Sequence, residues 1–285
     1  MAVLGQRLQT RKMAGIMEYR PVLSIAGSDS GGCAGIQADI KSISACGGFA
    51  CTALTALTAQ NTQGVNGVFA VPPAFLGEQM DAVCNDIDIK AVKIGMLHSA
   101  EVINRVAEKL TAHRLQKIVL DPVMVATSGD PLISPEAIDA LKRILPQASL
   151  ITPNIPEAEL LLGETIARDT MEAQARKMGQ TFQTAVLLKG GHLPQSDTML
   201  DVLYDLNTDS THRFENPYSP SNNTHGTGCS LSSAIATYLA HDLGLVEAVD
   251  KGITFVAQGI RSGADKNLGK GHGPIDFFWR QNQKA

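Results

Sequence analysis

Residues 22–45 read VLSIAGSDSGGCAGIQADIKSISA, and this stretch passes from one structural pattern to another. Residues 22–26 form a short apolar run typical of a buried strand, which we expect to end at Gly27. Residues 34–45 place apolar side chains at helical spacing and predict a helix. A buried strand followed directly by a helix is typical of an α/β fold with a parallel sheet.

The same alternation continues along the rest of the chain. Further strands are predicted at residues 52–59, 91–94, 118–120, 150–152 and 185–188, with helices between most of them, such as 100–113 and 135–145. Residues 200–214 interrupt this rhythm and predict an antiparallel pair at a sheet edge, and helices at 228–241 and 246–262 close the chain. The sequence therefore predicts one α/β domain at residues 20–285, with a mainly parallel sheet and helices on both faces.

Composition excludes several classes of protein. The 285 residues are 44% hydrophobic and 18% charged, with a formal net charge of −4. No apolar run approaches the roughly 20 residues that span a bilayer, and no basic patch stands out, so we expect neither a membrane nor nucleic acid as a partner. The five cysteines form an odd set without a CxxC pair, which favours free thiols and a cytoplasmic location. Residues 1–19 carry basic side chains without an apolar signal region, and we expect them to be a disordered leader.

Glycine and polar residues follow the predicted strands at the point where each strand ends. They lie at residues 27–32 (GSDSGG), 60–62 (QNT), 93–96 (KIGM), 121–124 (DPVM), 152–154 (TPN) and 189–191 (KGG). Parallel α/β sheets bind their ligands at the carboxyl ends of the strands. The sequence therefore predicts a binding site along this one edge, although residues 27–32 alone would also suit a plain turn capped by Asp29 or Ser30.

Residues 223–234, NTHGTGCSLSSA, lead into a predicted helix. Gly226 and Gly228 allow a tight turn that exposes amide groups at the helix start, where unpaired N–H groups and the helix dipole attract an anion such as phosphate. The alternative is an ordinary glycine-containing cap before a buried helix. The stretch is not a Walker A loop, because no GKS or GKT sequence ends it.

Cys229 interrupts this turn and has two interpretations. A thiol near a helix N-terminus has its thiolate favoured by the dipole, so it can accept a proton or attack carbon. The alternative is a small buried apolar residue, which is the usual role of cysteine. The other four cysteines lie in apolar segments and are interpreted as structural; they are Cys33, Cys46, Cys51 and Cys84.

Four further side chains at the same edge are candidates for chemistry. Asp121 and Glu157 supply the carboxylate oxygens that Mg²⁺ prefers, although Glu157 also suits the first turn of a helix. Lys189 follows a buried strand and either contacts a phosphate or extends to solvent. The carboxamide of Gln60 offers a donor beside an acceptor and so matches an aminopyrimidine edge, or it bonds to nearby backbone.

The chain resembles the hydroxymethylpyrimidine and phosphomethylpyrimidine kinases of thiamine biosynthesis, which belong to the ribokinase-like superfamily. The matching pieces run from about residue 22 to the C-terminus and include AGSDSGG, TALTAQNTQGV, KIGML, LDPVMVATSGDPL, LITPNIPEAELLLG, VLLKGGH, NTHGTGCSLSSA and GHGPI. The resemblance implies a three-layer ribokinase-like α/β sandwich and a homodimer. It also implies ATP- and Mg²⁺-dependent phosphorylation of the pyrimidine alcohol and then of its monophosphate.

The resemblance also implies roles for individual residues. The amides of Gly226, Thr227, Gly228 and Cys229 would form an anion hole for the phosphoryl group, and Cys229 would replace as base the aspartate of sugar kinases. Gln60 would bind the amino edge of the pyrimidine, in a ring pocket shaped by Gly27, Ala34, Met96 and Val123. Asp121, Asn154 and Glu157 would form the magnesium and phosphate network, with Lys189 near the phosphates of ATP. Cys33 departs from the family, which usually has glycine there.

Three other functions stay open at this point. A pyridoxal kinase would use the same frame, and Cys229 would then form a thiohemiacetal with the aldehyde. A non-catalytic sensor of a pyrimidine or nucleotide would not need the full set of acids, amides and lysine. A cysteine hydrolase using Cys229 and His225 lacks an evident acid to orient the histidine. The histidines show no metal-binding spacing and are interpreted as structural, including His192, His225 and His272.

Overall fold

The structure is a computed structural model that describes residues 18–124, 133–191 and 197–282. Most of the predicted leader, up to residue 17, lies outside the described residues, and so does His192. In the described part of the chain, no helix has both the length and the apolar character that a bilayer crossing requires.

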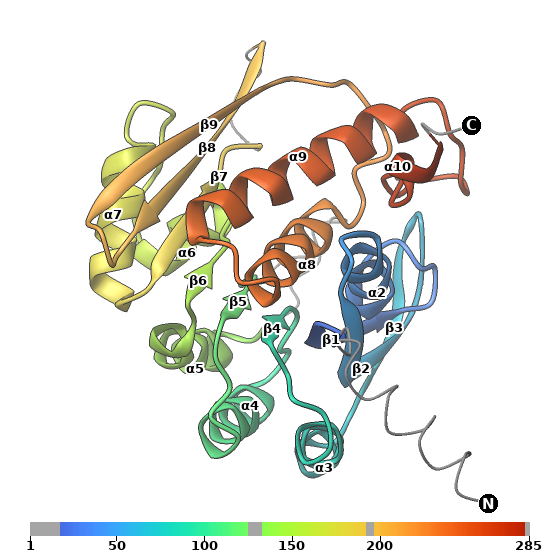
Figure 1. The fold of residues 1–285 in the computed structure, drawn as a ribbon, viewed down its shortest axis with the longest axis vertical. Coiled ribbons are helices and arrows are strands. Elements are labelled where there is room, and N and C mark those ends of the chain that lie inside the picture. The colour runs from blue at the N-terminus through green and yellow to red at the C-terminus, as the bar shows by residue number, and fades with distance from the viewer. Residues whose placement is uncertain (1–17, 125–132, 192–196, 283–285) are drawn as a thin grey trace, which may run out of the picture.

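A single nine-stranded sheet forms the centre of the fold, with the strand order β3-β2-β1-β4-β5-β6-β7-β8-β9 (Figure 1). Its strands are β1 (Pro21–Asp29), β2 (Phe49–Asn61), β3 (Gly64–Ala70), β4 (Ala91–Ile94), β5 (Ile118–Leu120), β6 (Leu150–Ile151), β7 (Ala185–Lys189), β8 (Thr198–Asp205) and β9 (Ser210–Pro217). The six strands from β2 to β7 in this order are parallel, and β8 and β9 form an antiparallel pair at one edge. The predictions of a mainly parallel sheet and of an antiparallel edge pair are confirmed.

Helices cover both faces of this sheet (Figure 1). One face packs against α2 (Gly35–Ala45), α8 (Thr227–Ala240) and α9 (Leu245–Gly263). The other packs against α3 (Pro73–Cys84), α4 (Ala100–Ala112), α5 (Pro135–Ile144), α6 (Ile155–Leu162) and α7 (Met171–Phe182). The arrangement confirms the predicted three-layer sandwich. A short 3₁₀ turn, η2 (Leu145–Gln147), follows α5, and the described chain ends in α10 (Trp279–Asn282).

The central strands are apolar on both sides because each side faces a separate core. In β1, Leu23 and Ile25 lie in the core beneath α3 to α7, whereas Val22 lies in the core beneath α8 and α9. In β4, Val92 and Ile94 alternate with Ala91 in the same way. Successive side chains of a strand point to opposite faces, so a strand buried on both faces has no polar alternation.

Two strand predictions were incomplete. Strand β1 continues past Gly27 to Asp29, because this glycine makes room for a neighbour instead of ending the strand: a Cβ placed there would lie 2.6 Å from Cε of Met96. Strand β3 was missed altogether. It pairs antiparallel with β2 at the other edge of the sheet, and because most of its residues are exposed it lacks the apolar pattern of a buried strand.

Candidate active site

The turn before helix α8 is shaped by one glycine that no other residue can replace. Gly226 is the N-cap of α8 and has a φ of 80°, in the left-handed region. A Cβ at this position would lie 1.9 Å from the carbonyl oxygen of Cys33. The turn therefore packs directly onto the backbone that follows β1, and the start of α8 is held at the carboxyl end of that strand.

The first amides of α8 face a buried ion pair. Ser230 N–H donates to Gly226 O at 2.9 Å, whereas Gly228 and Cys229 occupy positions where a helix offers no earlier carbonyl to its N–H groups. A Cβ at Gly228 would lie 3.2 Å from Oδ2 of Asp121 and 3.5 Å from Nζ of Lys189. The helix start thus presents amide donors beside a lysine ammonium, an arrangement that attracts anions.

The ion pair itself joins the ends of three strands. Lys189, at the end of β7, donates to Oδ1 of Asp121 at 2.9 Å, and the Thr152 hydroxyl donates to the same oxygen at 3.0 Å. Both charged side chains are largely buried. Burial would lower the pKa of Lys189, but the carboxylates of Asp121 and Glu157 outweigh it, so the pKa is raised and the lysine stays charged.

Glu157 and Asn154 form a capping box at the start of α6. Glu157 N–H donates to Oδ1 of Asn154 at 2.9 Å, and Asn154 N–H donates to Oε2 of Glu157 at 2.8 Å. Burial, opposed by Lys189 and reinforced by Asp121, raises the pKa of Glu157 to about 7. The capping interpretation of Glu157 therefore holds in the structure, and its carboxyl group also belongs to the electrostatic cluster of Asp121 and Lys189.

A second ion pair lies beneath the turn and was missed in the sequence. Asp39 of α2 accepts bonds from Lys93 Nζ at 2.8 Å and Ser24 Oγ at 2.6 Å through Oδ2, and from Ser233 Oγ at 2.8 Å through Oδ1. All four residues are fully buried. Ser233 lies one turn after Cys229 on α8, so this network ties α8 to α2, β1 and β4. The available signal was the single charged residue Lys93 inside the otherwise apolar segment 91–94.

Cys229 is a protonated thiol in this setting. Burial raises its pKa to about 11; Lys93 opposes the shift, and the carboxylates of Asp39 and Asp121 add to it. This direction is opposite to the one expected from the helix dipole, and burial is its largest cause.

Four residues were expected to shape a ring pocket. Two of them contact each other, one lies beside Gly226, and one lies beside the Asp121–Lys189 ion pair. Gly27 lies against Met96, whose carbonyl oxygen accepts a bond from Thr55 Oγ1 at 2.8 Å. The Cα of Ala34 lies 3.3 Å from the position of a Cβ on Gly226. Val123 donates its N–H to the carbonyl oxygen of Asp121 at 2.8 Å. The structure thus distributes these four residues along the edge that carries the turn and the ion pair.

Gln60 and His225 join the end of β2 to the turn. Nε2 of Gln60 lies 3.1 Å from Nε2 of His225, which is 3.7 Å from Oδ2 of Asp29. Burial lowers the pKa of His225, although Asp29 opposes the shift, so the ring is neutral at pH 7. The spacing of the histidines in the sequence favours a structural role for His225, and its place beside Gln60 follows only from the fold.

Asp29 and Cys33 shape the turn after β1. Asp29 is buried, and its carboxylate accepts bonds from the amides of Gly31, Cys33 and Ala34 at 2.8 to 2.9 Å. Cys33 is also buried and does not have a positive φ, so its departure from the family glycine costs no backbone strain.

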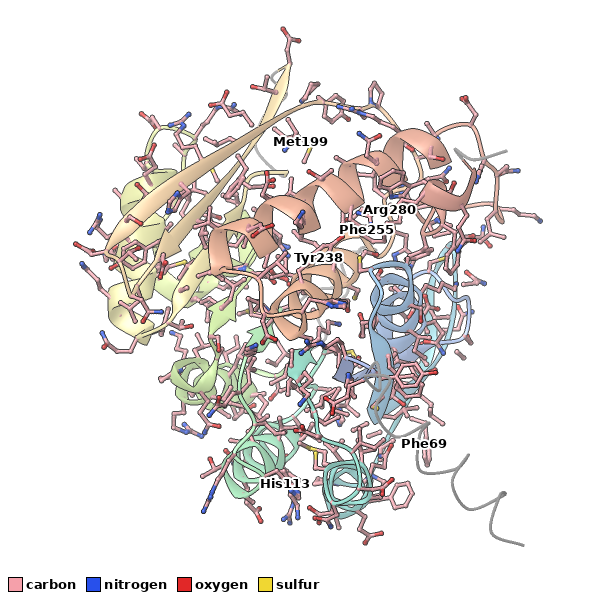
Figure 2. All side chains as sticks on the ribbon, in the orientation of Figure 1. Phe69, His113, Met199, Tyr238, Phe255 and Arg280 are labelled. Carbon is pink, nitrogen blue, oxygen red and sulfur yellow. The ribbon has the colours of Figure 1, made fainter. Side chains whose placement is uncertain are left out.

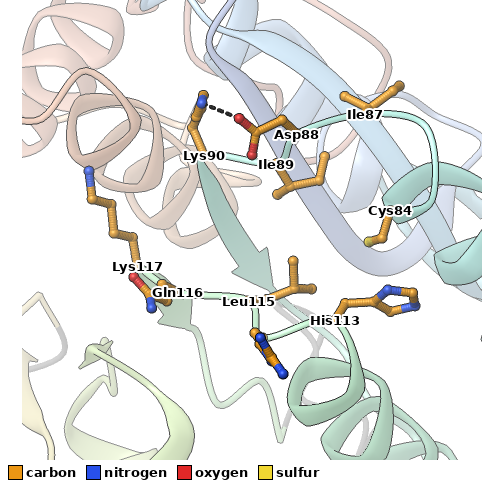
Figure 3. A pocket seen from close by; sticks show the side chains of 10 residues that line it. Cys84, Ile87, Asp88, Ile89, Lys90, His113, Leu115, Gln116 and Lys117 are labelled. Atoms are coloured by element: carbon orange, nitrogen blue, oxygen red, sulfur yellow. Dashed lines mark hydrogen bonds and ion pairs between the residues drawn. The ribbon is translucent and has the colours of Figure 1, made fainter.

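A cavity of about 350 Å³ lies at the amino ends of the parallel strands, whereas the candidate site lies at their carboxyl ends (Figure 3). It is lined by residues 84, 87–90 and 113–117, near the amino ends of β4 and β5. Since ligands of parallel sheets bind at the carboxyl ends, this cavity is separate from the candidate site.

We expect the substitution Lys93→Met to destabilise the protein by about 3–5 kcal/mol, because it leaves the Asp39 carboxylate buried without a counter-charge. Urea unfolding followed by circular dichroism measures this change. The double substitution Lys93→Met with Asp39→Asn removes both charges and should recover part of the loss. A single variant that unfolds at the wild-type urea concentration would show that the pair does not stabilise the fold.

Comparison with known proteins agrees with this geometry. Residues 29–276 match the family described as phosphomethylpyrimidine kinase. The chain is 44% identical over 265 residues to the hydroxymethylpyrimidine/phosphomethylpyrimidine kinase of Salmonella typhimurium, covering 92% of this chain and 98% of that protein. It is 50% identical over 259 residues to the thiamine biosynthesis bifunctional protein ThiED of Geobacter sulfurreducens, covering 90% of this chain and 52% of that longer protein.

Solved structures give the same picture of the fold. The phosphomethylpyrimidine kinase of Clostridium difficile superposes with a TM-score of 0.75 at 40% identity, covering 84% of this chain and 99% of that one. The ADP complex of Bacillus subtilis pyridoxal kinase superposes with a TM-score of 0.84 at 30% identity, covering 93% and 99%. A Staphylococcus aureus pyridoxal kinase with AMP-PCP and pyridoxal has a TM-score of 0.82 at 30% identity, covering 93% and 95%.

Proposed function

The chain belongs to the phosphomethylpyrimidine kinase family, and we propose that it phosphorylates 4-amino-5-hydroxymethyl-2-methylpyrimidine and then the monophosphate for thiamine synthesis. It is a phosphotransferase. The observation that carries the choice of substrate is the identity of 44% to a relative named for both pyrimidine activities, against 30% to the pyridoxal kinases.

Pyridoxal kinase is the second candidate, because two pyridoxal kinase structures superpose with higher TM-scores than the phosphomethylpyrimidine kinase does. Turnover of both alcohols with ATP by one purified sample distinguishes the two functions. We expect kcat/KM for the pyrimidine to exceed that for pyridoxal, and the pyrimidine monophosphate to be phosphorylated further. Higher kcat/KM on pyridoxal, with no diphosphate formed from the pyrimidine, would contradict the proposal.

The reaction requires alignment and charge stabilisation more than covalent chemistry. The hydroxymethyl oxygen forms a bond to the γ-phosphorus as the bond from that phosphorus to ADP breaks, through a loose transition state with charge on the phosphoryl oxygens. We propose that the amides of Gly226, Thr227, Gly228 and Cys229 receive this charge, with the Lys189 ammonium beside them. Asn154 and Lys189 would contact ATP, and Cys229 as thiolate would accept the proton of the alcohol late in the step.

Mg²⁺ fits the acidic residues of the site. The described residues hold no group of three or more acidic, histidine or cysteine side chains arranged to hold a metal. Mg²⁺ does not need such a cage, since one or two carboxylates, waters and substrate phosphates suffice. Asp121 and Glu157 would supply those carboxylates, and the ion would neutralise phosphate charge. Activity that survives complete chelation of divalent ions would contradict this assignment.

Assembly as a homodimer is supported by an exposed apolar face on the strands β2 and β3. Leu57 and Phe69 pair across these two strands on the same face and are 44% and 68% exposed, and Phe69 is labelled in Figure 2. An apolar edge strand of this kind usually needs cover. The mass in solution, measured by light scattering, tests the assignment: a wild-type monomer would contradict it, whereas Phe69→Glu should dissociate a dimer.

Residues 20–285 would act as one kinase domain in the cytoplasm. The one sheet that contains β1 to β9 supports a single domain, and five free cysteines suit a reducing compartment. Limited proteolysis that yields two stable fragments, or recovery of the protein outside the cytoplasmic fraction, would contradict these assignments.

A further inference from the structure

The carboxamide of Gln60 is held from both ends by side chains that leave it little freedom. Its Nε2 lies 3.1 Å from Nε2 of His225, and its Oε1 lies 3.1 Å from Oγ1 of Thr58. The backbone of Gln60 is also fixed, because Ser30 Oγ donates to its carbonyl oxygen at 2.7 Å and accepts from its N–H at 2.8 Å. A half-turn of the carboxamide exchanges its oxygen and nitrogen without moving any other heavy atom.

The proton of Thr58 decides between the two orientations. Thr58 Oγ1 lies 2.7 Å from the carbonyl oxygen of Ser28, which can only accept. The single hydroxyl proton is therefore given to Ser28, and Oγ1 is left as an acceptor. The carboxamide atom beside it must then be the NH₂ group, since two acceptors 3.1 Å apart would repel each other.

The contacts of the carboxamide with His225 favour the same orientation as the Thr58 hydroxyl proton does. With its nitrogen toward Thr58, Gln60 presents its oxygen to His225, which must then carry a proton on Nε2. That N–H also lies near Oδ2 of Asp29, 3.7 Å away, where a lone pair on the same nitrogen would face a carboxylate. The charge of Asp29 at the His225 end and the single hydroxyl proton at the Thr58 end thus select the same orientation, with the carboxamide oxygen toward His225.

The selected orientation leaves one N–H and one lone pair of the carboxamide for a ligand. The oxygen lies on the side of His225, which directly precedes the turn at residues 226–229. A pyrimidine whose 5-hydroxymethyl group reaches that turn has its neighbouring 4-amino group on the same side, and the next ring atom is the acceptor N3. The 4-amino group can then donate to the carboxamide oxygen, and N3 can accept from the carboxamide N–H. Pyridoxal reverses this order, because its aldehyde oxygen, next to the hydroxymethyl group, only accepts.

We propose that His225 and Thr58 are positioning residues that lock the carboxamide of Gln60 with its oxygen toward His225, and thereby favour a 4-aminopyrimidine over pyridoxal. This inference rests on the proposed function, in which Gln60 contacts the substrate ring. It predicts that loss of either residue frees the carboxamide to turn, so that discrimination between the two substrates falls while ATP binding is retained.

The test compares variants on three alcohols: the aminopyrimidine, the same pyrimidine without its 4-amino group, and pyridoxal. For His225→Ala and Thr58→Val we expect KM for the aminopyrimidine to rise about tenfold, since one hydrogen-bond partner of the carboxamide is lost, with KM for ATP unchanged. The preference over the other two alcohols should fall by a similar factor. His225→Gln and Thr58→Ser keep the donor and the hydroxyl and should retain most of the preference, and His212→Ala on β9 is the matched control.

Several outcomes overturn the inference separately from the proposed function. Equal losses on all three alcohols, or an unchanged preference in His225→Ala, would show that His225 does not orient Gln60. If the wild type does not phosphorylate the aminopyrimidine, the proposed function itself fails. If Gln60→Ala keeps the wild-type preference, Gln60 does not read the ring. Nitrogen-15 NMR of the wild type gives an independent test: a neutral His225 with its proton on Nε2 is expected, and a proton only on Nδ1 would overturn the inference.

Discussion

Replacing Gly226 with alanine is expected to lower kcat by a factor of about 10² or more, because the amides at the start of α8 lose their positions. A Cβ at residue 226 would lie 1.9 Å from the carbonyl oxygen of Cys33, and the φ of 80° is strained for any residue but glycine. The turn would have to move away from the chain after β1. The helix start that faces Asp121 and Lys189 would move with it.

Gly163→Ala is the matched control for this substitution. Gly163 caps the end of α6 with a φ of 72°, so it shares the left-handed backbone, but a Cβ there would meet nothing within 4 Å. It should cost about 1–2 kcal/mol of stability and leave kcat unchanged. Steady-state kinetics and thermal unfolding of both variants separate the effect of backbone strain from the effect of displacing the turn before α8. A folded Gly226→Ala enzyme with kcat within about threefold of wild type would contradict the role of the turn.

Replacing Cys229 with alanine is expected to lower kcat by about 10²–10⁴, the usual contribution of a positioned base. KM for ATP should change little, because the amide of residue 229 is kept. Single-turnover kinetics with saturating ATP measure the chemical step directly. An alanine variant with wild-type turnover would show that the thiol takes no part in the reaction.

The pH dependence of kcat gives a sharper test of the same residue. Because the pKa of Cys229 is raised to about 11, the thiolate fraction rises about tenfold per unit throughout the neutral range. Above about pH 7, where the Glu157 carboxyl group is ionised, we expect kcat of the wild type to rise with pH in the same way and that of Cys229→Ala to be flat. Cys229→Asp supplies a base that is ionised at neutral pH and should flatten the profile while retaining activity. A flat profile for the wild type would contradict a thiolate base.

Most of the central sheet could be predicted from the sequence because its strands are buried on both faces. Their continuous apolar runs, separated by helical patterns, gave the parallel arrangement and located the edge at which the ligand-binding candidates lie. Asp121, Lys189 and the turn at Gly226 come together because the carboxyl ends of neighbouring parallel strands share that edge. By contrast, β3 is an exposed edge strand, and no buried pattern marks it.

The remaining features of the site depend on contacts between distant parts of the chain. Asp39 and Lys93 are 54 residues apart, and nothing in either local sequence indicates that they form a buried pair with Ser233. The sequence left two interpretations of Cys229 open because helix position can be read from sequence, whereas the burial that raises the pKa of this thiol cannot. The orientation of Gln60 likewise depends on His225, which lies 165 residues away and which only the fold brings to the carboxamide.

A crystal structure of the protein with a non-hydrolysable ATP analogue and the hydroxymethylpyrimidine would show whether the amides at the start of α8 hold the transferred phosphoryl group. We expect oxygens of the terminal phosphate about 2.7–3.2 Å from the amide nitrogens of Gly228 and Cys229, with the hydroxymethyl group on the far side of that phosphorus. A terminal phosphate more than about 5 Å from both amides, in a complex that holds both ligands, would contradict it.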